Sequence, residues 1–150
     1  MIYLDTSVLV AYYYPEPLSD VAQDVVRSQP QPAISSLTEV ELISALARKT
    51  REGGLSKQGA ERIATLFLSH VEEGLYRRLL ISEQHYDQAR DWLQSFQTPL
   101  RTLDALHLAT AAAADLQLVT ADKTLAASAN ALGLTAQLLL PPDESTINGG

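Results

Sequence analysis

Brief apolar runs alternate along the chain with segments whose apolar residues recur every three or four positions. The runs are too short for helices and predict strands. The predicted strands are residues 2–4, 33–34, 75–81 (with 79–81 as the core part), 116–119 and an edge strand within 134–140. The spaced pattern predicts helices. The predicted helices are residues 7–14, 18–27, 37–51, 56–73, 82–93, 102–115 and 122–132.

Strands separated by helices are typical of α/β proteins with a mainly parallel sheet and helices on both of its faces. Neither repeats nor a dividing linker interrupt the pattern, so we expect residues 1–140 to form one domain. Residues 141–150 are polar and predict a mobile C-terminal tail.

Composition narrows the class of protein. The chain has 150 residues, 46% of them hydrophobic and 19% charged, as in an ordinary globular domain. It has no Cys, and His70, His85 and His107 lack the spacing of zinc ligands. Because the sequence has no membrane-spanning apolar run and no signal-peptide pattern at its start, we expect a cytoplasmic protein without membrane contact.

The net charge of −7 argues against broad binding to nucleic-acid backbones. It does not exclude a nuclease whose acidic site is filled by metal ions. Most basic residues lie in the middle of the chain, where they could form a local positive face. The candidate phosphate contacts are Arg48, Arg77, Arg78 and Arg101. Each of them, taken singly, is also explained as a surface residue.

The turn after the first predicted strand carries the first candidate site residue. Asp5 ends the apolar run of residues 2–4, and Thr6 and Ser7 follow it. In open α/β sheets, ligands bind at the carboxyl ends of the strands. Thr6 and Ser7 are both good helix caps, so we expect one to cap the helix and the other to face the site.

Three further acids are predicted to reach the same sheet edge. Asp122 closely follows the strand 116–119, Asp104 opens an apolar helix, and Glu41 lies inside the third helix. Asp122 could simply cap its helix, and Asp104 could simply favour the helix dipole. Four neighbouring carboxylates, however, repel one another without a counter-charge. Their oxygen atoms suit Mg²⁺ or Mn²⁺.

Glu39 competes with Glu41 as the acid of the third helix. Ser36 with Glu39 and Thr38 with Glu41 both fit a capping box, so this motif does not choose between them. Glu41 has small neighbours on its helix face, whereas those of Glu39 are bulky. We therefore interpret Glu41 as the site residue and Glu39 as the cap.

Four segments in this order carry a resemblance to a known family. They are Asp5-Thr6-Ser7-Val8-Leu9, Thr38-Glu39-Val40-Glu41-Leu42, Leu103-Asp104-Ala105-Leu106-His107-Leu108-Ala109 and Leu118-Val119-Thr120-Ala121-Asp122. With them the chain resembles a PIN domain and, more narrowly, the VapC-type toxins of bacterial and archaeal toxin–antitoxin pairs. The resemblance extends to about residue 137.

The resemblance implies a three-layer α/β/α fold with strand order 3-2-1-4-5. It also implies a Mg²⁺- or Mn²⁺-dependent ribonuclease, a cognate antitoxin and a homodimer. The acidic metal-binding positions of the family fall on Asp5, Glu41, Asp104 and Asp122, and its hydroxyl positions on Thr6 or Ser7 and on Thr120. The chain departs from the family at Leu125, where an aromatic residue is often found.

We therefore expect an endoribonuclease that hydrolyses RNA phosphodiester bonds. The alternative is a PIN-like module that binds RNA or protein. A receiver-like signalling domain is disfavoured, because the second and third strands are followed by Ser35 and Ser82 rather than by Asp. Two features remain open: His107 could be structural or belong to the site, and residues 12–14, all Tyr, could pack in the core or anchor a partner.

Overall fold

The computed structural model describes residues 1–142. The predicted tail lies outside the described residues from position 143 onward. The strands are β1 (Ile2–Leu4), β2 (Ala33–Ser35), β3 (Arg77–Leu79), β4 (Gln117–Thr120) and β5 (Ala136–Leu138). The helices are α1 (Thr6–Tyr13), α2 (Ser19–Arg27), α3 (Ser36–Arg51), α4 (Lys57–Glu72), α5 (Glu83–Gln94), α6 (Thr102–Ala113) and α7 (Lys123–Ala131).

The strands form one parallel sheet in the order β3-β2-β1-β4-β5, which confirms the predicted fold class and topology. β1 lies at the centre, where Tyr3 pairs with Ala33 on one side and with Leu118 on the other. Since every strand runs the same way, all carboxyl ends meet at one edge of the sheet. That edge is where residues following β1, β2 and β4 come together.

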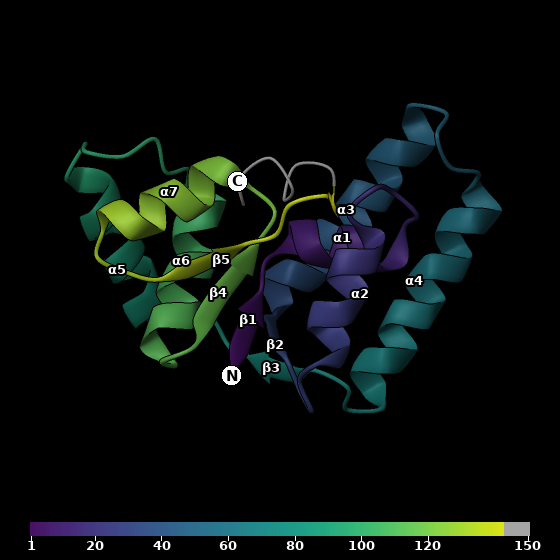
Figure 1. The fold of residues 1–150 in the computed structure, drawn as a ribbon, viewed down its shortest axis with the longest axis horizontal. Helices are drawn as coiled ribbons and strands as arrows, with labels where there is room; N and C mark the ends of the chain where they lie inside the picture. Colours follow the sequence, from purple (N-terminus) through teal and green to yellow (C-terminus); the bar gives the residue numbers. More distant parts are fainter. Residues whose placement is uncertain (143–150) are drawn as a thin grey trace.

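Helices cover both faces of the sheet, with α1 to α4 on one side and α5 to α7 on the other (Figure 1). The alternation of side chains along β1 explains the two cores. Ile2 and Leu4 pack in the core beneath α1, α2 and α4. Tyr3 points to the other face and packs with the residues of α5, α6 and α7. None of the helices in residues 1–142 is long and apolar enough to cross a membrane.

The third strand, β3, begins and ends earlier in the chain than the apolar residues 79–81, which we predicted to be its core. β3 begins at Arg77, which pairs with Ala33 of β2, whereas Leu80 lies beyond the strand and is 82% exposed. β3 is an edge strand with exposed arginines, so backbone pairing and not side-chain burial defines it. The placement of the strand core at residues 79–81 was therefore wrong.

The cap of α3 also differs from the prediction. The N-cap residue is Ser35, whose hydroxyl accepts from the Thr38 backbone N–H, while the Thr38 hydroxyl accepts from the Ser35 N–H at 3.2 Å. Glu39 takes no part, because both of its carboxylate oxygens accept hydrogen bonds from Arg78, at 2.5 and 3.0 Å. Interpreting Glu39 as the cap was wrong. A hydroxyl at position 38 completes the box instead.

Candidate active site

Asp5 leaves the central strand at the carboxyl edge of the sheet and is 6% exposed. Its backbone N–H donates to the Val119 carbonyl at 3.0 Å, which continues the pairing of β1 with β4. Its carboxylate Oδ2 accepts from Ser7 Oγ at 2.7 Å and from Thr120 Oγ1 at 2.8 Å. Within residues 1–142, Oδ1 accepts no hydrogen bond. One oxygen of Asp5 is therefore anchored by two hydroxyls, while the other, Oδ1, lies 4.0 Å from His107 Nε2.

Neither hydroxyl of the first turn caps α1, contrary to the expectation that one would. The N-cap position belongs to Asp5, whose side chain makes no capping bond. Ser7 Oγ donates to Asp5 and accepts from the Ala121 backbone N–H at 3.0 Å. Thr6 Oγ1 donates to Glu41 Oε1 at 2.8 Å. Both hydroxyls therefore orient carboxylates.

Glu41 reaches this edge from α3, and its side chain is 24% exposed. The oxygen that accepts from Thr6 also accepts from His107 Nε2. Burial by itself raises the pKa of Glu41, but the hydrogen bonds from His107 and Thr6, with the charge interaction of His107, outweigh it and lower that pKa. Glu41 is therefore held as a carboxylate.

Asp122 caps α7, which was one of the two roles considered for it from the sequence. Its Oδ1 accepts from the backbone N–H groups of Thr124 at 2.8 Å and Leu125 at 3.2 Å. Its own N–H donates to Thr120 Oγ1 at 3.0 Å, so Thr120 touches two of the acids. The cap uses a single oxygen. Asp122 is thus both a cap and a rigidly placed carboxylate at the sheet edge.

Asp104, in the first turn of α6, forms no hydrogen bond or ion pair within residues 1–142. Burial raises its pKa to about 6, and the negative charges of Asp5 and Asp122 add to the increase. His107 opposes this shift, and Glu41 contributes to it slightly. The charges of the other three predicted acids therefore all raise the pKa of Asp104.

The donor set fits a hard divalent cation in its chemistry. Asp5, Glu41 and Asp122 each hold one oxygen in place and leave the other without a hydrogen bond inside the described range. The ion pairs found in residues 1–142 join none of the four acids to Lys or Arg. In that same part of the chain, no three His, Asp or Glu side chains lie close enough together to hold a metal ion. The acids thus match the ligands of a Mg²⁺ site in type and charge, but in this structure their side chains do not lie close enough together to coordinate an ion.

His107 and Tyr3 are buried beside the acids, and sequence reasoning gave them little or no part in the site. His107 has no exposed surface, and its Nε2 lies 4.0 Å from Asp5 Oδ1 as well as in contact with Glu41. Its Nδ1 lies 2.6 Å from the Tyr3 hydroxyl. Two spacings in the sequence carry this signal. His107 is three residues after Asp104 on one helix face, and Tyr3 is two residues before Asp5 on one strand face.

A cavity of about 500 Å³ opens beside Glu41. Its walls combine the acid end of the site with a basic end on α3. The lining residues of interest are Thr6, Ser7, Glu41, Ser44, Ala45, Arg48, Lys49 and Arg51. Of the four arginines predicted to contact phosphate, only Arg48 lines this cavity; Arg78 pairs with Glu39 instead.

The tyrosines at positions 12–14 are all partly buried. Tyr13 packs edge-on against Phe67, and its hydroxyl lies 2.6 Å from that of Tyr76. Tyr14 donates its hydroxyl proton to the Gly54 carbonyl at 3.1 Å. These contacts give the tyrosines a packing role between α1 and α4.

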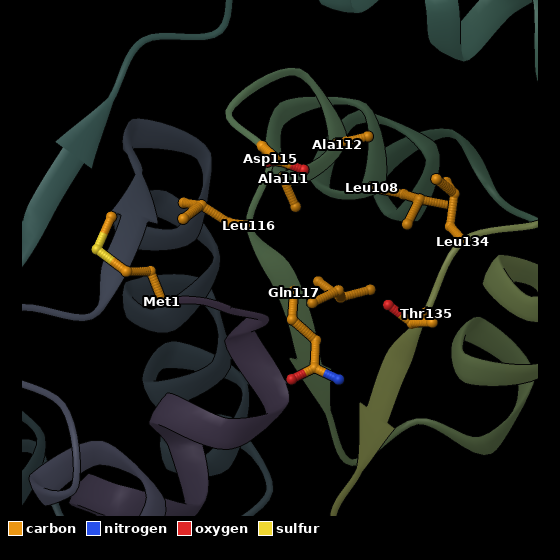
Figure 2. Close-up of a pocket in the computed structure, with 10 residues that line it drawn as sticks. Met1, Leu108, Ala111, Ala112, Asp115, Leu116, Gln117, Leu134 and Thr135 are labelled. Atoms are coloured by element: carbon orange, nitrogen blue, oxygen red, sulfur yellow. The ribbon is translucent and has the colours of Figure 1, made fainter.

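A second cavity, of about 400 Å³, lies at the opposite edge of the sheet (Figure 2). Met1, Leu116 and Gln117 line it at the amino ends of β1 and β4. None of the four predicted acids lines it, although Asp115 does.

A parallel sheet with β1 at its centre and carboxylates from four elements at one edge defines an α/β domain with an acidic site. The chain belongs to the PIN domain family, whose model matches residues 2–130, as the sequence motifs predicted. No functionally curated protein matches the chain significantly.

Solved structures share this fold at low sequence identity. FitAcB from Neisseria gonorrhoeae matches with a TM-score of 0.64 and 22% identity, covering 94% of this chain and 98% of that one. VapC20 from Mycobacterium tuberculosis, a sarcin–ricin-loop-cleaving toxin, matches with a TM-score of 0.67 and 20% identity. The match covers 95% of this chain and 100% of that one. A toxin–antitoxin complex from Klebsiella pneumoniae matches with a TM-score of 0.58 and 21% identity, covering 84% of this chain and 91% of that one.

Proposed function

We propose that this protein is a divalent-metal-dependent endoribonuclease that hydrolyses RNA phosphodiester bonds. One observation carries the proposal: Asp5, Glu41 and Asp122 are each anchored through one oxygen, and Asp104 is coupled electrostatically to all three. The similarity to VapC20, a sarcin–ricin-loop-cleaving toxin, supports the choice of substrate.

In this proposal the four acids hold Mg²⁺ or Mn²⁺, with Asp5 and Asp104 as the principal ligands. A bound divalent cation supplies Lewis-acid activation of water and of the scissile phosphate. Ser7 and Thr120 keep Asp5 in place, and Thr6 and His107 keep Glu41 in place. Water would attack the phosphorus and the P–O3′ bond would break, so the products would carry 5′-phosphate and 3′-hydroxyl ends, with no part for the RNA 2′-hydroxyl as nucleophile.

The test is cleavage of a structured RNA with Mg²⁺ or Mn²⁺, comparing wild type with Asp5→Ala. We expect metal-dependent cleavage, 5′-phosphate ends, and a loss of at least about 100-fold in Asp5→Ala. Asp24→Ala is a matched control, since Asp24 is an exposed aspartate on α2 whose side chain makes no hydrogen bond or ion pair within residues 1–142. Equal cleavage by wild type and Asp5→Ala contradicts the proposal.

The alternative is a PIN-like module that binds RNA or protein without cleaving it. One observation favours it: the acids of residues 1–142 are not gathered closely enough to hold a metal ion. RNA binding that survives EDTA, with no cleavage in Mg²⁺ or Mn²⁺, would select this alternative.

We further propose that the chain, as one domain over residues 1–140 in the cytoplasm, acts as the toxin of a toxin–antitoxin pair. The complex from Klebsiella pneumoniae that shares its fold supports an antitoxin partner. Co-expression with a small DNA-binding protein encoded next to this gene is expected to give a stable complex and to suppress cleavage. Persistent cleavage in that complex contradicts the toxin assignment but leaves the nuclease assignment intact.

A homodimer is the remaining part of this proposal. An apolar groove between α5 and α6 is lined by Tyr86, Leu93 and Phe96, and Phe96 is 89% exposed. Large exposed aromatic residues in such a groove are typical of interfaces. Sedimentation should show a dimer in wild type and a monomer in Phe96→Asp.

A further inference from the structure

Buried hydrogen bonds connect the middle of β1 to the acidic site. Tyr3, Ser35, Thr38 and His107 have no exposed surface. The Tyr3 hydroxyl lies 2.8 Å from Ser35 Oγ, 3.3 Å from Thr38 Oγ1 and 2.6 Å from His107 Nδ1. The other ring nitrogen, Nε2, contacts Glu41 Oε1. The chain of bonds thus runs from two hydroxyls through a phenol and an imidazole to a carboxylate.

The direction of each bond follows from the donors available. A carboxylate oxygen only accepts, so His107 Nε2 donates its proton to Glu41. While the imidazole is neutral, Nδ1 is then an acceptor, and Tyr3 donates to it. Ser35 in turn donates to the Tyr3 oxygen, which accepts. With these directions every atom of the chain has a partner, and all the protons point toward Glu41.

Tyr3 touches none of the four acids itself. It is held in the centre of the sheet, where β1 pairs with both β2 and β4. His107 lies in the fully buried stretch of α6, with buried neighbours from Ala105 to Ala111. Neither element can shift without disturbing a core. Any influence of Tyr3 on the site therefore passes through His107.

We propose that Tyr3 is a positioning residue: its hydroxyl fixes His107 with the proton on Nε2, and His107 thereby holds the Glu41 carboxylate in the site. Its importance for cleavage rests on the proposed function, whereas the hydrogen-bond relay does not. Without the phenol proton, Nδ1 becomes an unsatisfied buried acceptor. If the proton instead moves from Nε2 to Nδ1, Nε2 becomes an acceptor that faces a carboxylate, and two acceptors repel. Glu41 then leaves its place.

Tyr3→Phe removes the hydroxyl without changing the packing of the ring. Tyr76→Phe is the matched control, because Tyr76 is also a buried phenol with a hydrogen-bonded hydroxyl, 2.6 Å from that of Tyr13, but it has no bond to the acids. Both substitutions remove one buried hydroxyl. They differ in whether that hydroxyl leads to Glu41.

The first measurement is the ¹⁵N shifts of the His107 imidazole in the metal-free protein, assigned with His107→Asn. In wild type we expect a protonated Nε2 and an acceptor Nδ1. Tyr3→Phe should move both shifts toward the other tautomer, whereas Tyr76→Phe should leave them as in wild type. Unchanged His107 shifts in Tyr3→Phe overturn the proposal.

The second measurement is Mn²⁺ affinity by calorimetry together with the kcat and KM of RNA cleavage. Loss of an outer partner of a metal-ligand shell typically costs 10–100-fold, so we expect Mn²⁺ affinity and kcat to fall at least about tenfold in Tyr3→Phe, with KM unchanged. His107→Asn should lower the Mn²⁺ affinity and kcat by as much or more. The double variant Tyr3→Phe/His107→Asn should have the same Mn²⁺ affinity and kcat as His107→Asn alone. Additive losses of Mn²⁺ affinity and kcat in the double variant overturn the relay, and so does a loss in Tyr76→Phe equal to that in Tyr3→Phe.

The two proposals fail in different ways. If wild type cleaves no RNA in Mg²⁺ or Mn²⁺ while the ¹⁵N shifts respond to Tyr3→Phe, the relay stands and the nuclease proposal falls. If wild type cleaves RNA and the shifts do not respond, the nuclease stands and the relay falls.

Discussion

Thr120 donates its hydroxyl proton to Asp5 Oδ2 at 2.8 Å, across 115 residues of sequence. The bond joins the ends of β1 and β4 and is buried. The same Thr120 oxygen accepts from the Asp122 backbone N–H at 3.0 Å. One hydroxyl therefore sets the relative position of two of the four acids.

We expect Thr120→Val to weaken the fold and the site together. A hydrogen bond to a charged acceptor contributes about 1.5–3 kcal/mol to the free energy of unfolding, and valine fills the same volume without the donor. Urea unfolding should show a loss in that range, and calorimetry should show weaker Mn²⁺ binding. Thr120→Ser keeps the hydroxyl and should restore both. A valine variant equal to wild type would contradict this role.

Asp104→Asn should stabilise the metal-free protein at neutral pH. The pKa of Asp104 is raised to about 6 in the folded state by burial and by Asp5 and Asp122. Folding therefore favours the protonated form of Asp104. The free energy of unfolding falls as the pH rises from about 4, the pKa of Asp in the unfolded chain, through about 6, its pKa in the folded protein. Thermal unfolding in EDTA should give Asp104→Asn a higher Tm than wild type at pH 7 but not at pH 3.5. Added Mn²⁺ should raise the Tm of wild type more than that of the variant.

Arg48→Ala should weaken RNA binding more than Arg78→Ala. Arg48 lines the cavity beside Glu41, whereas Arg78 pairs with Glu39. Binding measured without divalent metal should show a salt dependence lowered by about one counterion for Arg48→Ala. Arg78→Ala should keep the wild-type salt slope and lose at most about 1 kcal/mol of stability, because it removes an exposed ion pair. Equal effects of the two variants on binding would exclude this phosphate contact.

The protein should lose stability steeply in alkaline solution. Burial raises the pKa values of Tyr3 and Tyr76 to about 12, and that of Tyr13 is also raised, by burial and by Tyr76. Since these phenols ionise near pH 10 when unfolded, their contribution is complete below pH 10 and is lost between about pH 10 and 12. Each phenol lowers the free energy of unfolding by at most about 1.4 kcal/mol per pH unit. Urea unfolding at pH 9 to 11 should show a smaller slope for Tyr76→Phe.

The sequence predicts the sheet and its acidic edge because both depend on local signals. Short apolar runs locate β1 and β4, and Asp5 and Asp122 follow directly from where those strands end. The exception is β3, an edge strand that buries little, so the apolar residues that follow it, such as Leu80, carried no information about pairing.

The prediction fails where a polar side chain chooses among several partners. Ser7 could cap a helix or bind Asp5, and Glu39 could cap a helix or pair with Arg78; only the folded geometry decides. The spacings of Tyr3 to Asp5 and of Asp104 to His107 place each residue beside an acid, but they do not show that the Tyr3 hydroxyl pairs with His107, 104 positions away. Long-range polar contacts of this kind are set by how the helices pack on the sheet and not by spacing along the chain.

The strand order has a consequence for synthesis on the ribosome. β1 is made first but has β4, from Gln117 to Thr120, as one of its two neighbours. Until that segment emerges, Asp5 lacks Thr120, and neither Asp104 nor Asp122 has reached the edge. A nascent chain therefore carries an incomplete acidic site until it is nearly finished. A protein that cleaves RNA would then be harmless to the ribosome that is still translating it.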